Sequence, residues 1–398
     1  MSLDLTTVAA QVIAMISGLR DSRAEQEKHL RFALDTLGSP AIDLDALKKK
    51  IKASKTTWLV ADIVEGLNKC YPLPPAPPDF TVIATDGSHI DVDRHHSTRC
   101  YLINIGSVVI RYGSQPDAVL SSAPRLYSDD SDLAITPPGG GREQPVEGNI
   151  LGTKRSIEEC RCLADLAAGL PPESMTLALL DGTLILWGLE AYPDFVTDAL
   201  LTNGMLKYLD AMKKLNKDRR LALASYISFP RSTDVVNVLR VAVCPNDVPD
   251  CDKQCPPEKG RDCDGLAGVR DRDLFINLLD NGERSALFIS PSKIVKEHYG
   301  EHRVYFFYLR VDDEIARIEI PQWVAANKDL LELTHSLVFD QCQRGRGYPV
   351  VLSEAHEQAV VTGADRENFW ELVESTLIEE HLPGSSSGKS LSKRTRWV

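Results

Sequence analysis

The sequence predicts a mixed α/β protein in which helices flank a β-sheet, and two observations carry this prediction. The first is a run of three apolar segments separated by polar turns, FTVIATD, RCYLINIGSVVIRYG and AVLSSAPRLYS, which is typical of an antiparallel meander. The second is the alternation of helical and strand-like segments after the meander, which is typical of helices packed on the faces of a sheet. The chain has 398 residues, of which 43% are hydrophobic, so it has ample material for a core.

The chain divides into four parts by composition. Residues 1–70 show apolar residues at helical spacing without strand-like alternation, which predicts a helical N-terminal region that continues through TTWLVADIVEGLNKC. Residues 71–80 contain five prolines and predict a stiff, extended linker. We expect the main domain over residues 81–383, with a Cys-rich insert at 244–263. The Ser/Gly-rich, basic segment 384–398 is expected to be a flexible tail.

In the main domain, the meander is followed by a helix (GTKRSIEECRCLADLAAGL), the strand TLALLDGTLI, a helix-rich stretch over 192–217 and the strand RRLALASYIS. The order β-β-β-α-β-α-β is that of the ribonuclease H-like fold, in which the first and fourth strands are neighbours and carry acids at their ends. A helix capped within 232–234, a second group of strands, a helix over 322–344 and a last helix in ADRENFWELVESTLIEEH complete the domain.

The first and fourth strands end alike, in Asp-Gly followed by a hydroxyl residue: Asp86 in ATDGSHI and Asp181 in LLDGTLI. Either motif alone is also an ordinary turn. Side by side, two carboxylates at rigid strand ends are suited to hold the divalent cations that phosphodiester hydrolysis uses. Glycine after each aspartate lets the backbone turn away and leaves room for metal and substrate.

The helix between these two strands offers a third carboxylate in KRSIEECRCLADL. Glu159 lies three and four residues before Cys162 and Leu163, on the face expected to be buried, where an unpaired acid is costly. Glu158 lies nearer the solvated face. A surface acid paired with a neighbouring arginine is an alternative for either glutamate.

Several classes of protein are disfavoured. The net charge of −12 argues against a protein that coats nucleic acid, because phosphate binding relies on clustered Lys and Arg. The chain has no GxxxxGK[ST] motif, and neither Asp-Gly motif has the preceding aspartate of haloacid-dehalogenase phosphatases. No apolar run is long enough to cross a membrane. With nine cysteines and no secretory signal, we expect reduced thiols in the cytoplasm.

Five segments together resemble the NurA nuclease family in the family's order, over most of the chain: ATDGSHI, the RSIEE helix, LLDGTLI, LASYISFPRS and YPVVLSEAHEQAVVTGADRENF. The resemblance implies a ribonuclease H-like core, a homodimer, and a manganese- or magnesium-dependent deoxyribonuclease. It implies 5′-to-3′ exonuclease activity and endonuclease activity on single strands. It also implies that the protein acts together with HerA, a hexameric DNA-translocating ATPase, in DNA end resection and repair or in antiphage defence.

Carried over by motif, the resemblance implies that Asp86, Glu159 and Asp181 bind the metal ions, with Glu158 as the alternative to Glu159. Tyr226 in ASYIS matches an active-site tyrosine that orients a phosphate. His356 in EAHEQA matches a histidine near the scissile phosphate, suited to proton transfer or charge stabilisation.

The insert CPNDVPDCDKQCPPEKGRDC places Cys244, Cys251, Cys255 and Cys263 with six, three and seven residues between them. Four thiols in a Pro/Gly-rich loop predict a structural zinc ion or an iron–sulfur cluster, which the spacing does not distinguish. Because the spacing contains no CxxC pair, free or disulfide-bonded cysteines are the alternative.

Two other functions are open at this point. One is a catalytically silent adaptor that keeps the ribonuclease H-like fold and docks DNA or the translocase. The other is an RNA-directed enzyme with the same chemistry. Arg231 and Arg366 are expected to contact phosphates in the nuclease, with a surface ion pair as the alternative for each.

Overall fold

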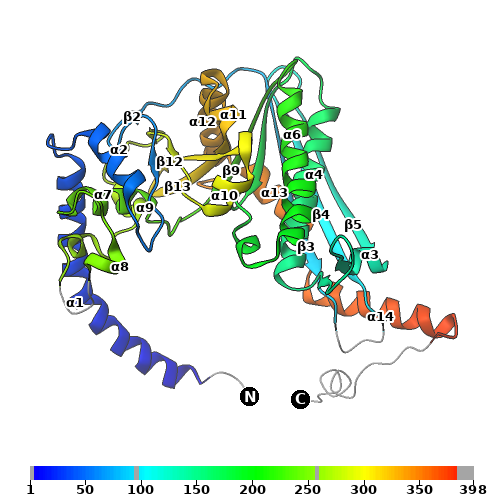
Figure 1. The fold of residues 1–398 in the computed structure, drawn as a ribbon. Coiled ribbons are helices and arrows are strands. Elements are labelled where there is room, and N and C mark those ends of the chain that lie inside the picture. Colours follow the sequence, from blue (N-terminus) through cyan, green and yellow to red (C-terminus); the bar gives the residue numbers. More distant parts are fainter. Residues whose placement is uncertain (1–3, 94–97, 256–259, 383–398) are drawn as a thin grey trace. The chain divides into compact units, whose positions relative to one another are not determined.

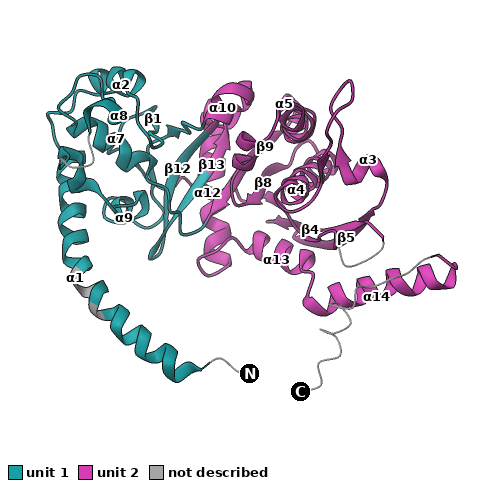
Figure 2. Cartoon of the chain, turned by 60° about the horizontal axis from the view of Figure 1, so that its bottom comes forward, with its two compact units in different colours: residues 1–73, 228–292, 305–318 teal, residues 74–227, 293–304, 319–398 magenta. Residues whose placement is uncertain are grey.

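The computed structural model describes residues 4–93, 98–255 and 260–382 (Figure 1). The chain forms two compact units, each assembled from segments that are far apart in the sequence (Figure 2). Unit 1 comprises Met1–Leu73, Ser228–Ser292 and Tyr305–Ile318, and unit 2 comprises Pro74–Ile227, Lys293–Val304 and Glu319–Val398. The expected N-terminal region is therefore part of a larger unit. The expected tail lies outside the described residues.

Unit 2 contains a mixed sheet with the strand order β9-β8-β3-β4-β5. The expected meander pairs antiparallel throughout, whereas β8 runs parallel to β3 and to β9. The strands are β3 (Phe80–Ile90), β4 (Tyr101–Tyr112), β5 (Asp117–Tyr127), β8 (Met175–Asp181) and β9 (Arg220–Ile227), with a separate pair β6 (Ala134–Ile135) and β7 (Gln144–Pro145). The mixed α/β fold with helices around a mixed sheet is thus confirmed.

Helices pack on both faces of this sheet, with α4 against β3, β4 and β8, and α13 against β3, β4 and β5. Figure 1 shows α4 beside α6, with which it is in contact. The α-helices of unit 2 are α3 (Asp130–Leu133), α4 (Asn149–Gly169), α5 (Asp194–Thr197), α6 (Leu206–Leu215), α10 (Lys293–His298), α11 (Gln322–Ala325), α12 (Lys328–Arg344), α13 (Val350–Ala359) and α14 (Gly363–Glu379). Tighter or wider helical turns form η1 (Trp187–Ala191), η2 (Asp198–Met205) and η4 (Gly300–His302).

The single helix expected over 322–344 is two helices, α11 and α12. Asn327 separates them because its side chain accepts hydrogen bonds from the amides of Asp329 and Leu330 and so starts a new helix.

The apolar face of α4 fixes its position on the sheet. Ile157 and Leu163 of α4 are buried in the same core cluster as Ile83, Ile103 and Ile105 of β3 and β4. Burying an aliphatic side chain of this size contributes roughly 1.5–3 kcal/mol. Because this apolar face packs against the sheet, Glu159, which is buried on the same side of α4, also faces the strands.

Unit 1 holds a smaller antiparallel arrangement in which β1 pairs with β11, β11 with β12, and β10 with both β12 and β2. The strands are β1 (Asp62–Ile63), β2 (Cys70–Tyr71), β10 (Arg284–Ser285), β11 (Phe288–Ile289), β12 (Val304–Val311) and β13 (Glu314–Pro321), of which the last two are shared with unit 2 at one end. The helices are α1 (Leu5–Leu37), α2 (Leu44–Ala53), α7 (Asp234–Val243), α8 (Cys251–Gln254), η3 (Asp262–Leu266) and α9 (Asp271–Phe275).

One local expectation for unit 1 is wrong and another holds only in part. Residues 56–70 are not helical, because Ile63 pairs with Phe288 in a sheet and the apolar residues around it are buried in the core of the unit. The expected cap of α7 within 232–234 is right in position, because Thr233 is the N-cap residue, but the Thr233 side chain makes no capping bond to the helix. The carboxylate of Asp271, from a distant segment, accepts from the first amides of α7 instead.

Among the described residues, none of the helices combines the length and the apolar content that a bilayer crossing requires.

Candidate active site

The parallel register of β3 and β8 brings the two Asp-Gly motifs together. Thr85 pairs with Leu180, so the next residues, Asp86 and Asp181, lie side by side. The expectation that the first strand ends at Asp86 is wrong: β3 continues to Ile90 because residues 87–90 still pair with β4, and only the pairing with β8 stops at Thr85. The chain leaves β8 through Gly182, whose φ of 82° favours glycine. Burial raises the pKa of Asp181 and the charge of Asp86 raises it further, which shows that the two carboxylates are close enough to repel.

Glu159 joins this pair from the α4 side. Its side chain is buried, 8% exposed, as the helical spacing predicts, and the Thr85 hydroxyl donates to its backbone oxygen at 2.9 Å. A Cβ atom at Gly87 would lie 2.6 Å from Oε1 of Glu159. The glycine after Asp86 therefore makes room for the glutamate.

The charge of Glu159 is poorly compensated. Burial raises the pKa of Glu159 to about 8; the Arg155 guanidinium opposes this shift, and Asp86 and Asp181 add to it. Nε of Arg155 lies 3.0 Å from Oε1 of Glu159, yet within the described residues neither atom has a properly aligned hydrogen-bond partner. Glu158, by contrast, pairs with Nε of Arg161 at 2.7 Å. The structure thus groups Glu159, not Glu158, with the two aspartates.

Helix α13 places His356 on Asp86, with Nδ1 2.8 Å from Oδ2. The helix sits directly on β4, because Gly106, the cross-strand partner of Asp86, has no side chain: a Cβ there would lie 2.2 Å from the backbone oxygen of Ala355. Asn104 fixes the end of the helix by donating to the backbone oxygen of Ala359 at 3.0 Å. The side chain of His356 is 67% exposed, so its ring is accessible to a substrate.

Tyr348, which the sequence reasoning missed, contacts a carboxylate of the candidate site. Its hydroxyl donates to Asp181, and burial followed by the Asp181 charge raises the pKa of Tyr348. The predicted Tyr226 is buried beside it, with ring centroids 5.4 Å apart, and its hydroxyl donates to the backbone oxygen of Gly347 at 3.5 Å. The Gly-Tyr-Pro sequence directly before the helix that carries His356 is the signal from which Tyr348 could have been found.

The two expected phosphate contacts fall in different units. Arg366 of unit 2 is close enough to His89 to act on it: burial lowers the pKa of His89, and the charges of Arg155 and Arg366 lower it further. Arg231 belongs to unit 1. Of the two, Arg366 lies in the unit that carries the carboxylates.

Carboxylates clustered on neighbouring strands of the sheet, with a histidine hydrogen-bonded to one of them, define the molecule as an α/β protein with an acidic candidate site. A family model described as the NurA domain matches residues 80–361, which is most of the chain. The chain therefore belongs to the NurA family, a family of nucleases, and a nuclease-associated function follows. The match runs from the first residue of β3 to just beyond α13. No curated protein gives a significant match.

The four cysteines of the insert lie near one another in unit 1. All are free thiols, and burial, followed by the neighbouring Cys255, Cys263 and Cys244, raises the pKa of the Cys251 thiol. Cys244, Cys255 and Cys263 line a cavity of about 300 Å³. In the described part of the chain, no three His, Cys, Asp or Glu side chains, here or at the carboxylates, already have the arrangement of a metal site.

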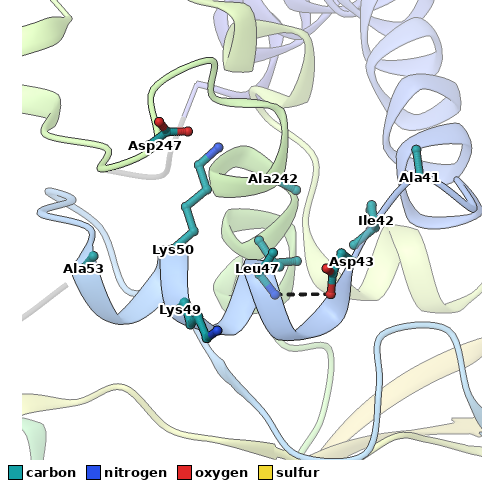
Figure 3. A pocket seen from close by; sticks show the side chains of 10 residues that line it. Ala41, Ile42, Asp43, Leu47, Lys49, Lys50, Ala53, Ala242 and Asp247 are labelled. Carbon is teal, nitrogen blue, oxygen red and sulfur yellow. Dashed lines mark hydrogen bonds between the residues drawn. The ribbon is translucent and has the colours of Figure 1, made fainter.

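A larger cavity of about 510 Å³ lies between α2 and α7 of unit 1 (Figure 3). Figure 3 shows Lys50 reaching from α2 towards Asp247, and its amine donates to the backbone oxygen of Cys244. None of the predicted site residues lines this cavity, but Asp247 of the insert does. The cavity therefore adjoins the Cys-rich segment and not the three carboxylates.

Proposed function

We propose that this chain is a divalent-metal-dependent deoxyribonuclease whose metal ligands are Asp86, Glu159 and Asp181. The observation that carries the proposal is Glu159, a buried carboxylate placed beside two others, with Oε1 lacking an aligned hydrogen bond within the described residues. Arg155 lies 3.0 Å from this carboxylate, yet the pKa of Glu159 stays raised to about 8, so a further positive charge would be needed to hold it ionised. The strand order β9-β8-β3-β4-β5, which fits the expected ribonuclease H-like core, supports the same conclusion.

The donor set fits Mn²⁺ or Mg²⁺. Both ions prefer carboxylate oxygens, and the three carboxylates come from rigid elements: Asp181 ends β8, Asp86 lies within β3, and Glu159 lies in the long helix α4. When bound, such an ion supplies a water of lowered pKa and neutralises the charge that develops on the phosphate.

The protein's own side chains have separate tasks. Because the Asp86 carboxylate accepts from Nδ1 of His356, the other ring nitrogen is left for a proton or a phosphate oxygen of the substrate. Tyr348 orients Asp181 through its hydroxyl. Arg155 offsets part of the charge of Glu159. Tyr226 packs behind Tyr348 and holds it in place.

The test compares two adjacent glutamates. End-labelled single- and double-stranded DNA is incubated with manganese and either wild type, Glu159→Gln or Glu158→Gln. We expect Glu159→Gln to lose cutting by at least about 100-fold, the scale on which a charge-stabilising group acts. Glu158→Gln, which loses only a partly exposed ion pair with Arg161, is the control and is expected to cut normally. Equal cutting by both variants would refute the metal-ligand assignment.

Family membership supports the finer parts of the proposal. These are 5′-to-3′ exonuclease and single-strand endonuclease activity, a homodimer in the cytoplasm, and work with a HerA-type hexameric translocase in DNA end processing, repair or antiphage defence. Repeating the assay with and without the cognate ring tests the partnership. A folded protein that binds the ring but cuts nothing under any condition would instead be a docking adaptor.

The four cysteines are proposed to hold a structural zinc ion or an iron–sulfur cluster. Their mutual proximity and the absence of disulfides among them support this, since thiolates gathered in one loop are the ligands that both centres use.

A further inference from the structure

Phe229 in unit 1 is an exposed aromatic ring on a strained backbone. Its side chain is 59% exposed and its φ is 46°, a conformation that bulky residues rarely adopt. Such strain persists only where the surroundings enforce it, and it concentrates at functional sites. The guanidinium of Arg272 lies 3.4 Å from the ring centroid and donates to the backbone oxygen of Phe229 at 3.2 Å. One face of the ring therefore stacks on a cation.

Positive charge gathers around this ring. Burial lowers the pKa of Arg272, and the charges of Arg270 and Arg231 lower it further, so three guanidinium groups lie close together. Asp273 lies 3.6 Å from Nε of Arg272 and acts in the opposite direction, since its negative charge raises the pKa of Arg272. An excess of positive charge at one place contrasts with the net charge of −12 of the whole chain.

A groove of about 450 Å³ continues from Arg272. It runs between α1 and the segment that starts α9, and Arg23, Arg270 and Arg272 line it. Glu27 pairs with Arg23 at 3.6 Å, but both side chains are mostly exposed, so the pair is easily exchanged for another anion. Glu27 and Asp273 also line the groove, and Phe229 adjoins it through its stacking on Arg272. We call the surface formed by Arg23, Arg270 and Arg272 of the groove, together with Phe229 and Arg231 beside it, the arginine groove.

A buried carboxylate holds the two loops of the arginine groove rigid. Asp271 is fully buried, and its carboxylate accepts from the amide of Val236 at 2.8 Å and from the Tyr308 hydroxyl at 2.6 Å. Its own amide donates to the backbone oxygen of Ser232 at 3.0 Å. The loop with Phe229 and Arg231 is thus tied to the loop with Arg270 and Arg272, which prepares the surface before any ligand arrives.

We propose that the arginine groove binds single-stranded nucleic acid, with the guanidinium groups on phosphates and a base on Phe229. Guanidinium groups bind phosphates with charge-assisted hydrogen bonds, and an exposed aromatic ring stacks on any unpaired base. A duplex keeps its base faces covered, and an acidic peptide would use the arginines but not the ring. The role of this binding, to hold the strand that is cut, rests on the proposed nuclease function. The binding itself does not require cutting and can be measured alone.

The test measures binding without cutting. Fluorescence anisotropy of a fluorescein-labelled oligothymidylate is recorded with the full chain in EDTA, over a series of salt concentrations. We expect Phe229→Ala to weaken binding roughly 5- to 150-fold, the range found when a stacked base loses its aromatic partner. Arg231→Gln is expected to weaken binding and to lower the slope of log affinity against log salt by about 0.7, the value for one phosphate contact on a single strand.

The matched control is Arg220→Gln. Arg220 is exposed and stands at the opposite end of β9 from the pair formed by Asp181 and Tyr226, so its variant should bind like wild type. Arg231 is exposed as well, so its variant tests the proposal even if Phe229→Ala fails to fold.

Two results would overturn the proposal. One is wild-type binding by both Phe229→Ala and Arg231→Gln. The other is competition by polyglutamate as strong as that by unlabelled oligothymidylate, with no effect of Phe229→Ala, which would make the groove an acidic-peptide surface. Weakened binding in a protein that never cuts DNA would support the arginine groove and refute the nuclease. Normal DNA cutting by wild type, together with unaltered DNA binding by both variants, would support the nuclease and refute the arginine groove.

Discussion

The buried charge of Glu159 predicts how stability depends on pH and metal. The pKa of Glu159 in the folded protein is raised to about 8 from the ordinary value of 4.5. In the absence of metal, the folded state therefore holds a proton that the unfolded chain releases. The stabilisation from this proton is complete below pH 4.5 and is lost as the pH rises towards 8.

The magnitude follows from the shift. A pKa difference of one unit corresponds to about 1.4 kcal/mol, so the raised pKa of Glu159 lowers the free energy of unfolding by about 5 kcal/mol in total across this range. A divalent cation that binds the charged carboxylate reverses the penalty, because metal ligands must be deprotonated. Added Mn²⁺ should therefore stabilise the protein more at pH 8.5 than at pH 5.5.

The assay is urea unfolding at pH 5.5, 7 and 8.5, in EDTA and in Mn²⁺, with wild type, Glu159→Gln and Glu158→Gln. Glutamine resembles the protonated acid, so in EDTA the free energy of unfolding of Glu159→Gln should exceed that of wild type by about 1.4 kcal/mol at pH 5.5 and by about 5 kcal/mol at pH 8.5. The variant should also gain less from Mn²⁺. Glu158→Gln should follow wild type throughout. A constant difference between wild type and Glu159→Gln at all three pH values would refute the reasoning.

Three further predictions concern other parts of the molecule. Gly87→Ala places a Cβ 2.6 Å from Oε1 of Glu159, so the free energy of unfolding should fall by about 1–3 kcal/mol and DNA cutting should fall with it. Gly152→Ala in α4, where a Cβ meets nothing, is the control and should be neutral or stabilising in the same urea-unfolding and cleavage assays. Tyr348→Phe removes the hydrogen bond to Asp181 and should lower kcat about 10-fold with KM little changed; an unaltered kcat would contradict the orienting role. Cys251→Ser should reduce zinc or iron bound per chain by elemental analysis, whereas the same change at the separate Cys70 should not; metal-free wild type would rule out the centre.

Local patterns in the sequence were enough for the core of unit 2. The meander, α4, β8 and β9 follow from apolar periodicity, and the burial of Glu159 follows from its spacing to Leu163. These are short-range properties, because side chains on one strand or one helix take their direction from the element itself. The same reasoning placed Asp181 correctly at the end of its strand, but it also ended the first strand at Asp86, whereas β3 continues to Ile90 because residues 87–90 pair with β4.

Where distant segments pair, local patterns misled. Residues 56–70 have a helical spacing, yet Ile63 pairs with Phe288 of β11 in a sheet, so long-range hydrogen bonding overrides the local preference. The cap of α7 comes from Asp271, a residue that no local motif connects with Val235.

The sequence by itself determined the strand and helix order of unit 2, its acidic residues and their likeness to the NurA family. Tertiary structure alone decided which side chains meet: Tyr348 on Asp181, Glu159 in the space left by Gly87, and α13 seated on Gly106 so that His356 reaches Asp86. The physical reason is that an element's own period sets the direction of its side chains, whereas the partner each side chain finds depends on how separate elements pack.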